Sequence, residues 1–377
     1  MRIGLLYYPK LDKGGVEKHI QSLLNANRDS EIDYVVISAT SQLFRESIQK
    51  SGVELIAWRP KNLSDKQALI ALKNIIQQSN LDILHVHSPA AGILIHKITK
   101  NNDIPIIQTL HLGYANFFAG NLDTLWRKIR GTYYAIVEKN LTKHFFTKTI
   151  FVARQAYQSA INSGSLPDQT AIFIPNGIDI NKYDGISKSN ARDTFSIPEG
   201  KIILTCIGRL SRQKGQDILL KAVAKLPKNI DIELWLVGDG PDKSKLDTLI
   251  SKLKVTENIK FLGYQKDVSP ILAASDIFIL PSRYDAYPYV LLEAMASGTA
   301  CIASDVGDIS NIIEPEKSGM LVPPGNIGSL SDAVINMIKD KHLRETLGQA
   351  GKLKISAMAT EQAMISATHK VYKSAIN

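Results

Sequence analysis

Residues 201–226, KIILTCIGRLSRQKGQDILLKAVAKL, predict the fold of this chain. The apolar run after Lys201 is typical of a strand in a parallel sheet that is covered on both faces. A loop ending at Gly215 follows it, and then comes a segment with helical spacing of apolar residues. A second strand, glycine loop and helix occupy residues 3–24. Because strands and helices alternate through the whole chain, we expect α/β architecture with open, doubly wound parallel sheets.

The length and composition indicate a two-domain globular protein. The chain has 377 residues, 44% hydrophobic and 21% charged, which are ordinary values for a soluble protein. No apolar run approaches the roughly 18 residues of a membrane-spanning helix. The N-terminal MRIGLLYYPK is interpreted as a strand and not as a signal peptide. Two cysteines, Cys206 and Cys301, cannot form a disulfide framework and are expected to be buried packing residues, so we expect a cytoplasmic protein.

The positive charge is concentrated in the first half of the chain. The net charge is +9, and residues 1–176 hold 20 basic and 13 acidic residues. Such a surface attracts anions: nucleic acid, anionic lipid or phosphorylated substrates. Zinc-finger spacing, an RNP-like aromatic motif and a long basic run are all absent from the sequence. Nucleic acid is therefore not expected as a partner.

Residues 114–151 combine aromatic side chains such as Trp126 with basic ones such as Arg127. One interpretation is a helix with an apolar face toward the core and a solvated basic side. The other is a patch that rests on anionic lipid or on a lipid-diphosphate acceptor. The second interpretation predicts peripheral association with the inner face of the cytoplasmic membrane.

Two glycine-containing loops could bind phosphate. Gly14 and Gly15 precede the first expected helix, whose free amides attract an anion, although a tight turn with Glu17 complementing the helix dipole is the alternative. In GRLSRQKG, residues 208–215, a cationic pair flanks a loop at the carboxyl end of a strand, where ligands bind in such sheets. Its Arg209 offers a fork for phosphate oxygens and its Lys214 a point charge, unless both are solvated loop charges.

The third candidate region is PSRYDAYPYVLLEAMASG, residues 281–298. A loop leads into a helix, with Asp285 before the helix and Glu293 in its second turn. Two carboxylates facing a phosphate site are costly unless they bind hydroxyl groups, which a ribose or a hexose supplies. The backbone amides expected to face the ligand are those of Tyr289, Val290 and Leu291.

Eight short motifs in order along some 300 residues resemble one family. They are GGVE (14–17), LHVHS (84–88), QTLH (108–111), IPNGID (174–179), GRLSRQKG (208–215), VGDGP (237–241), FLGY (261–264) and VGD (306–308). With Asp285, seven residues, Glu293 and then AMASG, the chain resembles the retaining glycosyltransferases of family 4. The family's pattern has Glu at the first of these positions, so Asp285 is a departure that shortens the side chain by about 1.5 Å.

The resemblance implies the GT-B fold, in which two Rossmann-like domains face each other across a cleft. Residues 1–178 would form the acceptor-side domain and residues 201–354 the domain that binds the nucleotide sugar. The polar, turn-rich residues 179–200 are interpreted as the linker. Residues 355–377 are expected to pack back onto the first domain.

The resemblance also implies roles for single residues. Arg209 and Lys214 should hold the donor diphosphate, Glu293 the donor ribose, and Asp285 and His111 should lie beside the transferred sugar. The glycines that should lie near the diphosphate or the acceptor are Gly14 and Gly15. The residues expected to contact the base, largely through backbone, are Gly263, Tyr264 and Gln265.

The expected reaction is hexosyl transfer from a nucleotide diphosphate sugar, with uracil as the expected base, to an acceptor hydroxyl. The anomeric configuration should be retained through front-face attack, with the backbone carbonyl of His111 stabilising positive charge on the sugar. The expected acceptor is a saccharide or lipid-linked saccharide of the cell envelope, in polysaccharide or glycolipid assembly. An epimerase of the same fold and a non-catalytic nucleotide-sugar-binding subunit are the alternatives.

No cofactor and no metal are expected. The sequence has no Asp-x-Asp that could bridge a diphosphate through a metal, so the cationic pair is expected to replace the ion. A metal site at His85, His87 and His111 is the minor alternative, because His85 and His87 alternate onto one face of a strand.

Overall fold

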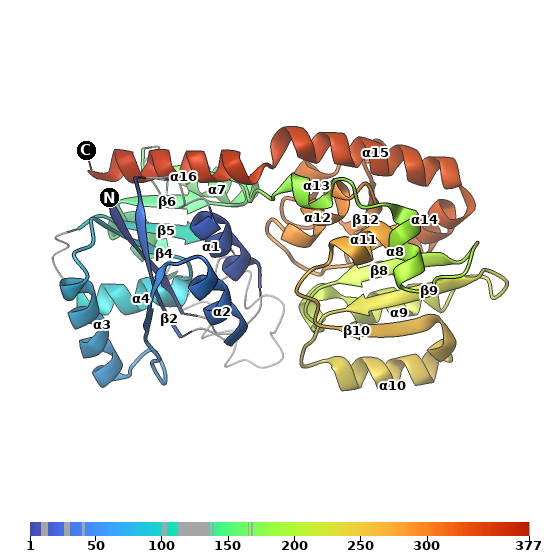
Figure 1. Ribbon diagram of the computed structural model, residues 1–377, viewed down its shortest axis with the longest axis horizontal. Helices are drawn as coiled ribbons and strands as arrows, with labels where there is room; N and C mark the ends of the chain where they lie inside the picture. Colours follow the sequence, from blue (N-terminus) through green and yellow to red (C-terminus); the bar gives the residue numbers. More distant parts are fainter. Residues whose placement is uncertain are drawn as a thin grey trace. The chain divides into compact units, whose positions relative to one another are not determined.

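The computed structural model divides the chain into two compact units (Figure 1). It describes residues 1–8, 14–25, 31–39, 42–99, 104–111, 136–137, 139–164, 166 and 169–376. The first unit comprises Met1–Asn176 and Glu361–Asn377, and the second comprises Gly177–Thr360. Each unit is built on a parallel sheet with helices on both faces, so the predicted doubly wound α/β fold is confirmed.

The first unit contains a seven-stranded parallel sheet in the order β3-β2-β1-β4-β5-β6-β7. Its strands are β1 (Arg2–Tyr7), β2 (Asp33–Ser38), β3 (Glu54–Ala57), β4 (Ile83–Val86), β5 (Ile106–Leu110), β6 (Lys148–Phe151) and β7 (Ala171–Phe173). Its helices include α1 (Gly15–Asn25), α2 (Gln42–Lys50), α3 (Lys66–Gln78), α4 (Pro89–Ile98), α7 (Arg154–Asn162) and α16 (Glu361–Ile376). Because the chain order reverses at β1 and β4, the carboxyl ends of these strands mark a binding position.

Alternating side chains of the strands fill two separate cores. In β1, Ile3 and Leu5 pack with residues of α1 and α16 on one face of the sheet. Leu6 points to the other face and packs with residues of α3 and α4, such as Leu72. This period of two, apolar on both faces, explains why the strands read as continuous apolar runs.

The C-terminal residues belong to both units. Helix α15 (Lys341–Met358) is part of the second unit, whereas α16 is part of the first. Tyr372 of α16 is fully buried, and its hydroxyl lies 2.7 Å from Nδ1 of His85. The segment expected to pack back onto the first domain, residues 355–377, therefore divides near Thr360, and only its second part enters the first core.

The second unit contains a six-stranded parallel sheet in the order β10-β9-β8-β11-β12-β13. Its strands are β8 (Ile202–Ile207), β9 (Ile232–Val237), β10 (Ile259–Gly263), β11 (Ile277–Leu280), β12 (Ala300–Ser304) and β13 (Met320–Val322). Its helices besides α15 are η2 (Ile180–Tyr183), α8 (Lys188–Thr194), η3 (Arg212–Lys214), α9 (Gln216–Val223), α10 (Lys243–Leu253), η4 (Thr256–Asn258), α11 (Ser269–Ala274), α12 (Tyr289–Ala296), α13 (Ile309–Ile312) and α14 (Ile327–Lys339). Both cysteines lie free and buried in its strands, and burial raises the pKa of Cys206 to about 12.

Residues 179–200, which their composition predicts to be a linker, are folded as part of the second unit. They form η2 and α8 and belong to the second unit. Their polar side chains stabilise these elements. Asp179 and Ser187 cap the two helices, and Arg192 donates a 3.1 Å hydrogen bond to Asp276. Caps and an ion pair give a folded segment the polar, turn-rich composition of a linker.

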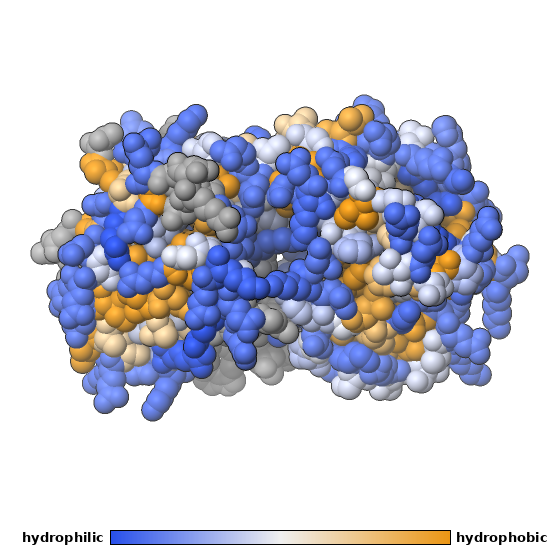
Figure 2. Space-filling view, in the orientation of Figure 1, coloured by the Kyte–Doolittle hydropathy of each residue, from blue (hydrophilic) through white to orange (hydrophobic). Residues whose placement is uncertain are grey.

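Hydrophilic side chains predominate on the face drawn in Figure 2, and apolar side chains form separate patches there. Among the described residues, no helix combines the length and the hydropathy needed to span a bilayer. Most of the basic and aromatic segment 114–151 lies outside the described residues, including everything from 112 to 135.

Gly215 allows the loop after β8 to pass close to the loop after β11. Its φ is +70°, and a Cβ atom built there would lie 2.0 Å from the carbonyl oxygen of Pro281. Gly185 in the same unit has a similar φ of +75° but open space around its Cβ position. At both positions a residue with a side chain would be strained by the positive φ, and only at Gly215 would its Cβ atom also collide with a neighbouring atom.

We therefore expect Gly215→Ala to destabilise the second unit more than Gly185→Ala does. Left-handed strain costs about 1–2 kcal/mol in both variants. Overpacking adds about 1–3 kcal/mol at Gly215 alone. Urea unfolding followed by tryptophan fluorescence measures the difference, and equal losses in the two variants would contradict the close approach.

Candidate functional site

Lys214 and Asp285 form an ion pair at the carboxyl ends of β8 and β11. The Lys214 Nζ lies 2.6 Å from Oδ2 of Asp285, and the hydroxyl of Ser282 donates to the same oxygen at 2.9 Å. Only 17% of the lysine side chain and 12% of the aspartate side chain are exposed. Because both groups are largely withdrawn from water, removal of one partner would leave the other without its counter-ion in a partly buried position.

A second ion pair fixes the two loops to each other. The guanidinium of Arg283 donates two hydrogen bonds of 2.7 Å to the carboxylate of Asp217. The Arg283 backbone also donates to the carbonyl of Gln213 at 2.8 Å. Although burial favours the neutral acid, the hydrogen bonds and charge of Arg283 hold the pKa of Asp217 below its usual value. This bidentate pair sets the distance between the two loops that carry Lys214 and Asp285.

Arg209 is positioned in the same loop as Lys214. Its backbone carbonyl accepts a 3.0 Å hydrogen bond from the side chain of Gln216. Within the described part of the chain, no hydrogen bond or ion pair engages its guanidinium group, which is partly exposed. Arg209 can therefore offer a fork of donors to an anion, as the sequence predicts.

Glu293 lies in α12 with 3% of its surface exposed. Its Oε1 accepts a 2.6 Å hydrogen bond from the hydroxyl of Tyr183, a residue of η2 that is itself buried. Burial raises the pKa of Tyr183, with the charges of Asp267 and Asp179 adding to the effect, so the phenol stays a donor at neutral pH. No motif in the sequence points to Tyr183, which is 110 residues away from its partner.

The helix start that was expected to present free amides is partly used by the fold. The backbone N–H of Leu291 donates to the carbonyl of Pro288 at 3.1 Å. Tyr289 is buried, and Val290 is half-buried. The structure thus leaves the amide of Leu291 engaged within the first turn of α12.

Two further loops of the second unit make close contacts: the loop with Gly307 contacts Asp285, and the loop with Gly238 contacts the end of β10. Gly307 has a φ of +56°, and a Cβ there would lie 2.0 Å from the Asp285 carbonyl oxygen. The carbonyl of Gly263 accepts a 2.7 Å hydrogen bond from Gly238. Tyr264 is 41% exposed, and the Gln265 side chain donates to the carbonyl of Leu262 at 2.7 Å. The motifs VGDGP, FLGY and VGD therefore all lie at carboxyl ends of strands in this unit.

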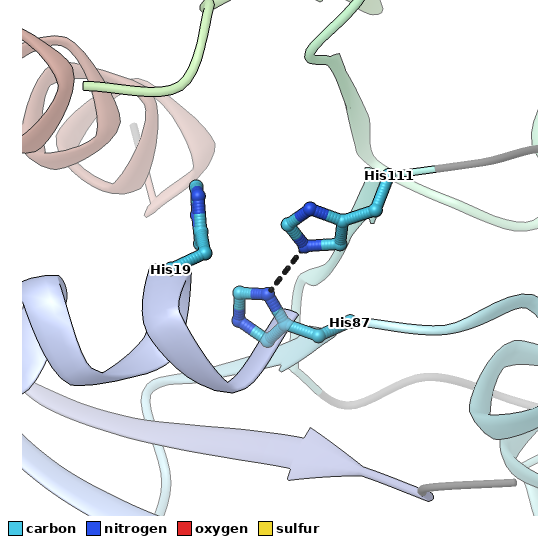
Figure 3. Close-up of side chains that lie close together, drawn as sticks. All are labelled: His19, His87 and His111. Carbon is cyan, nitrogen blue, oxygen red and sulfur yellow. Dashed lines mark hydrogen bonds between the residues drawn. The ribbon is translucent and has the colours of Figure 1, made fainter. Parts of the chain in front are cut away.

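Three histidines gather at the corresponding ends of strands in the first unit (Figure 3). His19 comes from α1, His87 follows β4, and His111 follows β5. Nδ1 of His87 lies 3.5 Å from Nε2 of His111, and the ring centroids of His19 and His111 are 4.7 Å apart. Gly14 and Gly15 lie at the start of α1, and nothing approaches the Cβ position of Gly14 within 4 Å.

His85 is not part of this group, contrary to the minor metal alternative. Its Nδ1 and Nε2 lie 2.7 Å from the hydroxyl groups of Tyr372 and Thr109, so both ring nitrogens are engaged. His19 takes its place, and sequence reasoning missed it because His19 sits on a helix, 68 positions away from His87.

The second unit has the chemistry for a phosphorylated ligand that carries hydroxyl groups. Arg209 and Lys214 supply positive charge, and Asp285 and Glu293 supply acceptors, all from loops or a helix at carboxyl ends of strands. This is the edge of a doubly wound sheet at which ligands bind.

Two family models match most of the chain in succession. The model described as Glycosyltransferase Family 4 matches residues 13–182, and the model described as Glycosyl transferases group 1 matches residues 187–354. The chain is 26% identical over 384 residues to N-acetyl-alpha-D-glucosaminyl L-malate synthase of Bacillus anthracis, covering 99% of this chain and 96% of that protein.

Two further similarities cover much of the chain. UDP-Gal:alpha-D-GlcNAc-diphosphoundecaprenol alpha-1,3-galactosyltransferase of Escherichia coli is 26% identical over 288 residues, 74% of this chain and 72% of that protein. The crystal structure of Anabaena HepE in complex with UDP superposes with a TM-score of 0.80 at 20% identity, covering 99% of this chain and 100% of that one. The similarity to HepE shows that the two chains share a fold.

Removal of the Tyr183 hydroxyl should destabilise the second unit. We expect Tyr183→Phe to lower the free energy of unfolding by about 1.5–3 kcal/mol, because the hydrogen bond ends on a buried carboxylate. Tyr284→Phe is the matched control, since this half-buried tyrosine has no hydroxyl hydrogen bond among the described residues. Urea denaturation measures both, and a Tyr183→Phe loss no larger than that of the control would show that the contact stabilises nothing.

Proposed function

Because this chain belongs to the glycosyltransferases, with a Glycosyltransferase Family 4 region followed by a Glycosyl transferases group 1 region, we propose that it is a retaining hexosyltransferase. It has the GT-B fold of two Rossmann-like domains. The donor is a nucleotide diphosphate sugar bound by the second unit. The observation that carries this proposal is the Lys214–Asp285 pair beside Arg209, at the carboxyl ends of β8 and β11.

The donor diphosphate is the group that needs most stabilisation. As the bond between the sugar and the diphosphate breaks, negative charge develops on the departing phosphate oxygens. Arg209 and Lys214 supply fixed positive charge to these oxygens, and loops tied by the Arg283–Asp217 pair hold both cations in place. Preorganised charge of this kind lowers the barrier without a metal ion, so we propose that transfer is metal-independent and needs no cofactor.

Asp285 exchanges partners when the donor binds. Its carboxylate lies 2.6 Å from the Lys214 ammonium. The diphosphate carries more charge than one carboxylate and takes over Lys214. Asp285 is then released to accept hydrogen bonds from hydroxyls of the transferred sugar. Glu293, oriented by Tyr183, accepts those of the ribose.

The transfer step forms a bond between the acceptor oxygen and the anomeric carbon on the face from which the diphosphate leaves. The anomeric carbon–phosphate oxygen bond breaks, and the electron pair goes to the diphosphate. The proton of the acceptor hydroxyl passes to the departing phosphate oxygen, so atoms and charge balance. The carbonyl of His111 stabilises the positive charge that the sugar carries in the transition state.

The names of the relatives support the choice of substrates. The Escherichia coli relative is named for UDP-galactose and a sugar linked to diphosphoundecaprenol, and Anabaena HepE is in complex with UDP. We propose a UDP-sugar donor and a saccharide or lipid-linked saccharide acceptor, in assembly of envelope polysaccharide or glycolipid. Contact with an anionic membrane surface stays a prediction of segment 114–151. The epimerase and non-catalytic alternatives are not favoured, because the relatives are named as a synthase and a transferase.

Lys214→Ala and Glu293→Gln should each reduce sugar transfer strongly. We expect losses of kcat/KM on the order of 10²–10³-fold, because each variant removes a group aimed at the donor. Lys228→Ala is the matched control, as Lys228 is an exposed lysine of the same unit. Transfer from UDP-sugars to lipid and saccharide acceptors is the assay, with circular dichroism to verify folding. Near-normal turnover in either variant would reject the donor site.

Asp285→Asn should separate binding from turnover. The variant removes the negative charge that competes with diphosphate for Lys214, so UDP should bind more tightly, by about tenfold for each 1.4 kcal/mol released. Turnover should fall, because an amide is a weaker acceptor for the sugar hydroxyls. Calorimetric titration with UDP and the transfer assay measure the two effects. Weaker UDP binding would contradict the exchange of partners.

A further inference from the structure

We propose that His19, His87 and His111 form a binding site for one divalent transition-metal ion, of which Zn²⁺ is the type, in the first unit. Each histidine offers one ring nitrogen, and these three atoms lie within 4.8 Å of one another. The residues come from three elements, α1 and the ends of β4 and β5, that the sheet topology brings together (Figure 3). The proposed function gives this group no metal.

The chemistry of the three side chains selects a transition metal. Imidazole nitrogen suits Zn²⁺, Co²⁺, Ni²⁺ and Cu²⁺, whereas Mg²⁺ and Ca²⁺ require oxygen ligands. Each of the three rings offers one nitrogen to the group, so each can supply one lone pair to an ion.

The spacing fits a tetrahedral site after a small adjustment. Ligand nitrogens about 2.05 Å from Zn²⁺ lie about 3.3 Å from one another in a tetrahedron. The observed 3.5 Å between Nδ1 of His87 and Nε2 of His111 is close to that value. No two of the three atoms are more than 4.8 Å apart, so the rings need to close by at most about 1.5 Å, which side-chain rotation allows.

Neighbouring residues orient two of the three rings. The Asn176 Oδ1 lies 3.3 Å from Nδ1 of His19, so a proton on Nδ1 leaves the lone pair on Nε2. The ring of His85 packs against that of His87 in a tilted arrangement, with 4.0 Å between ring centroids, and His85 itself is held by hydrogen bonds with Tyr372 and Thr109. Metal-binding histidines commonly have such supporting hydrogen bonds on the nitrogen that does not bind metal.

His87 has a second ring nitrogen, Nε2, which is not the nitrogen that faces His111. Within the residues that the structure describes, this Nε2 is buried and has no hydrogen-bond partner, so no hydrogen bond there opposes a small rotation of the ring. His111 is only half-buried and gives solvent, or a fourth ligand, access to the group.

A bound ion would inhibit sugar transfer. This consequence rests on the proposed function, in which His111 lies beside the transferred sugar. An ion held by His111 occupies that space and adds two positive charges next to the developing positive charge on the sugar. Zn²⁺ should therefore reduce turnover, whereas UDP binding at Lys214 of the second unit should persist.

Cobalt titration tests the site without relying on activity. The 377-residue chain, first treated with EDTA, should bind one Co²⁺ per chain and show the intense visible absorption of tetrahedral coordination. His19→Gln and His111→Gln should each weaken Co²⁺ binding by about 100-fold or more, as loss of a supporting residue alone costs about 10–100-fold. His342→Gln, at an exposed histidine of α15, is the matched control and should bind like the parent.

The outcomes separate the metal site from the proposed function. Weak octahedral absorption, or equal binding by the parent and both variants, would overturn the site. If Co²⁺ binds as expected and no acceptor receives sugar, the site stands and the proposed function fails. If transfer occurs and saturating Zn²⁺ leaves its rate unchanged, inhibition is refuted. Thermal melts without metal check that the His19→Gln variant is folded. If that variant is unfolded, the His111→Gln variant, at a partly exposed position, still tests the site.

Discussion

The ion pair between Lys214 and Asp285 is the interaction on which the candidate donor site depends. Both side chains are mostly withdrawn from water, the two charged groups lie 2.6 Å apart, and Ser282 adds a hydrogen bond to the carboxylate. The pair exists because Gly215 lets the loops after β8 and β11 touch. In the proposed function, the donor diphosphate takes the place of Asp285 as the partner of this lysine.

The two units differ in the charge of the side chains at the carboxyl ends of their strands. The second unit places cations and carboxylates at the strand ends, held by ion pairs and hydrogen bonds. The first unit places neutral rings there, because burial disfavours the charged form of each histidine. Charged groups suit a diphosphate, and neutral nitrogen ligands suit a sugar or a soft cation.

Local sequence was sufficient to predict which loops carry candidate site residues, but it was insufficient to predict the distant residues that contact them. Arg209, Lys214 and Gly215 stand out in the sequence because one short motif combines a strand end, a glycine and two positive charges. Tyr183 was missed because nothing within η2 distinguishes a packing tyrosine from one that donates to a carboxylate. The composition of residues 179–200 predicts a linker because helix caps and ion-paired residues are polar, as the residues of an exposed loop are.

The sequence by itself determined the alternation of strands and helices, the doubly wound sheets and the family, since these follow from periodicity and from motifs of neighbouring residues. Only the tertiary structure decided which side chains meet. Lys214 and Asp285 are 71 positions apart, Tyr183 and Glu293 are 110 apart, and His85 and Tyr372 are 287 apart. Contacts over such separations depend on the order of strands in a sheet and on the path of the chain, which no local pattern of residues encodes.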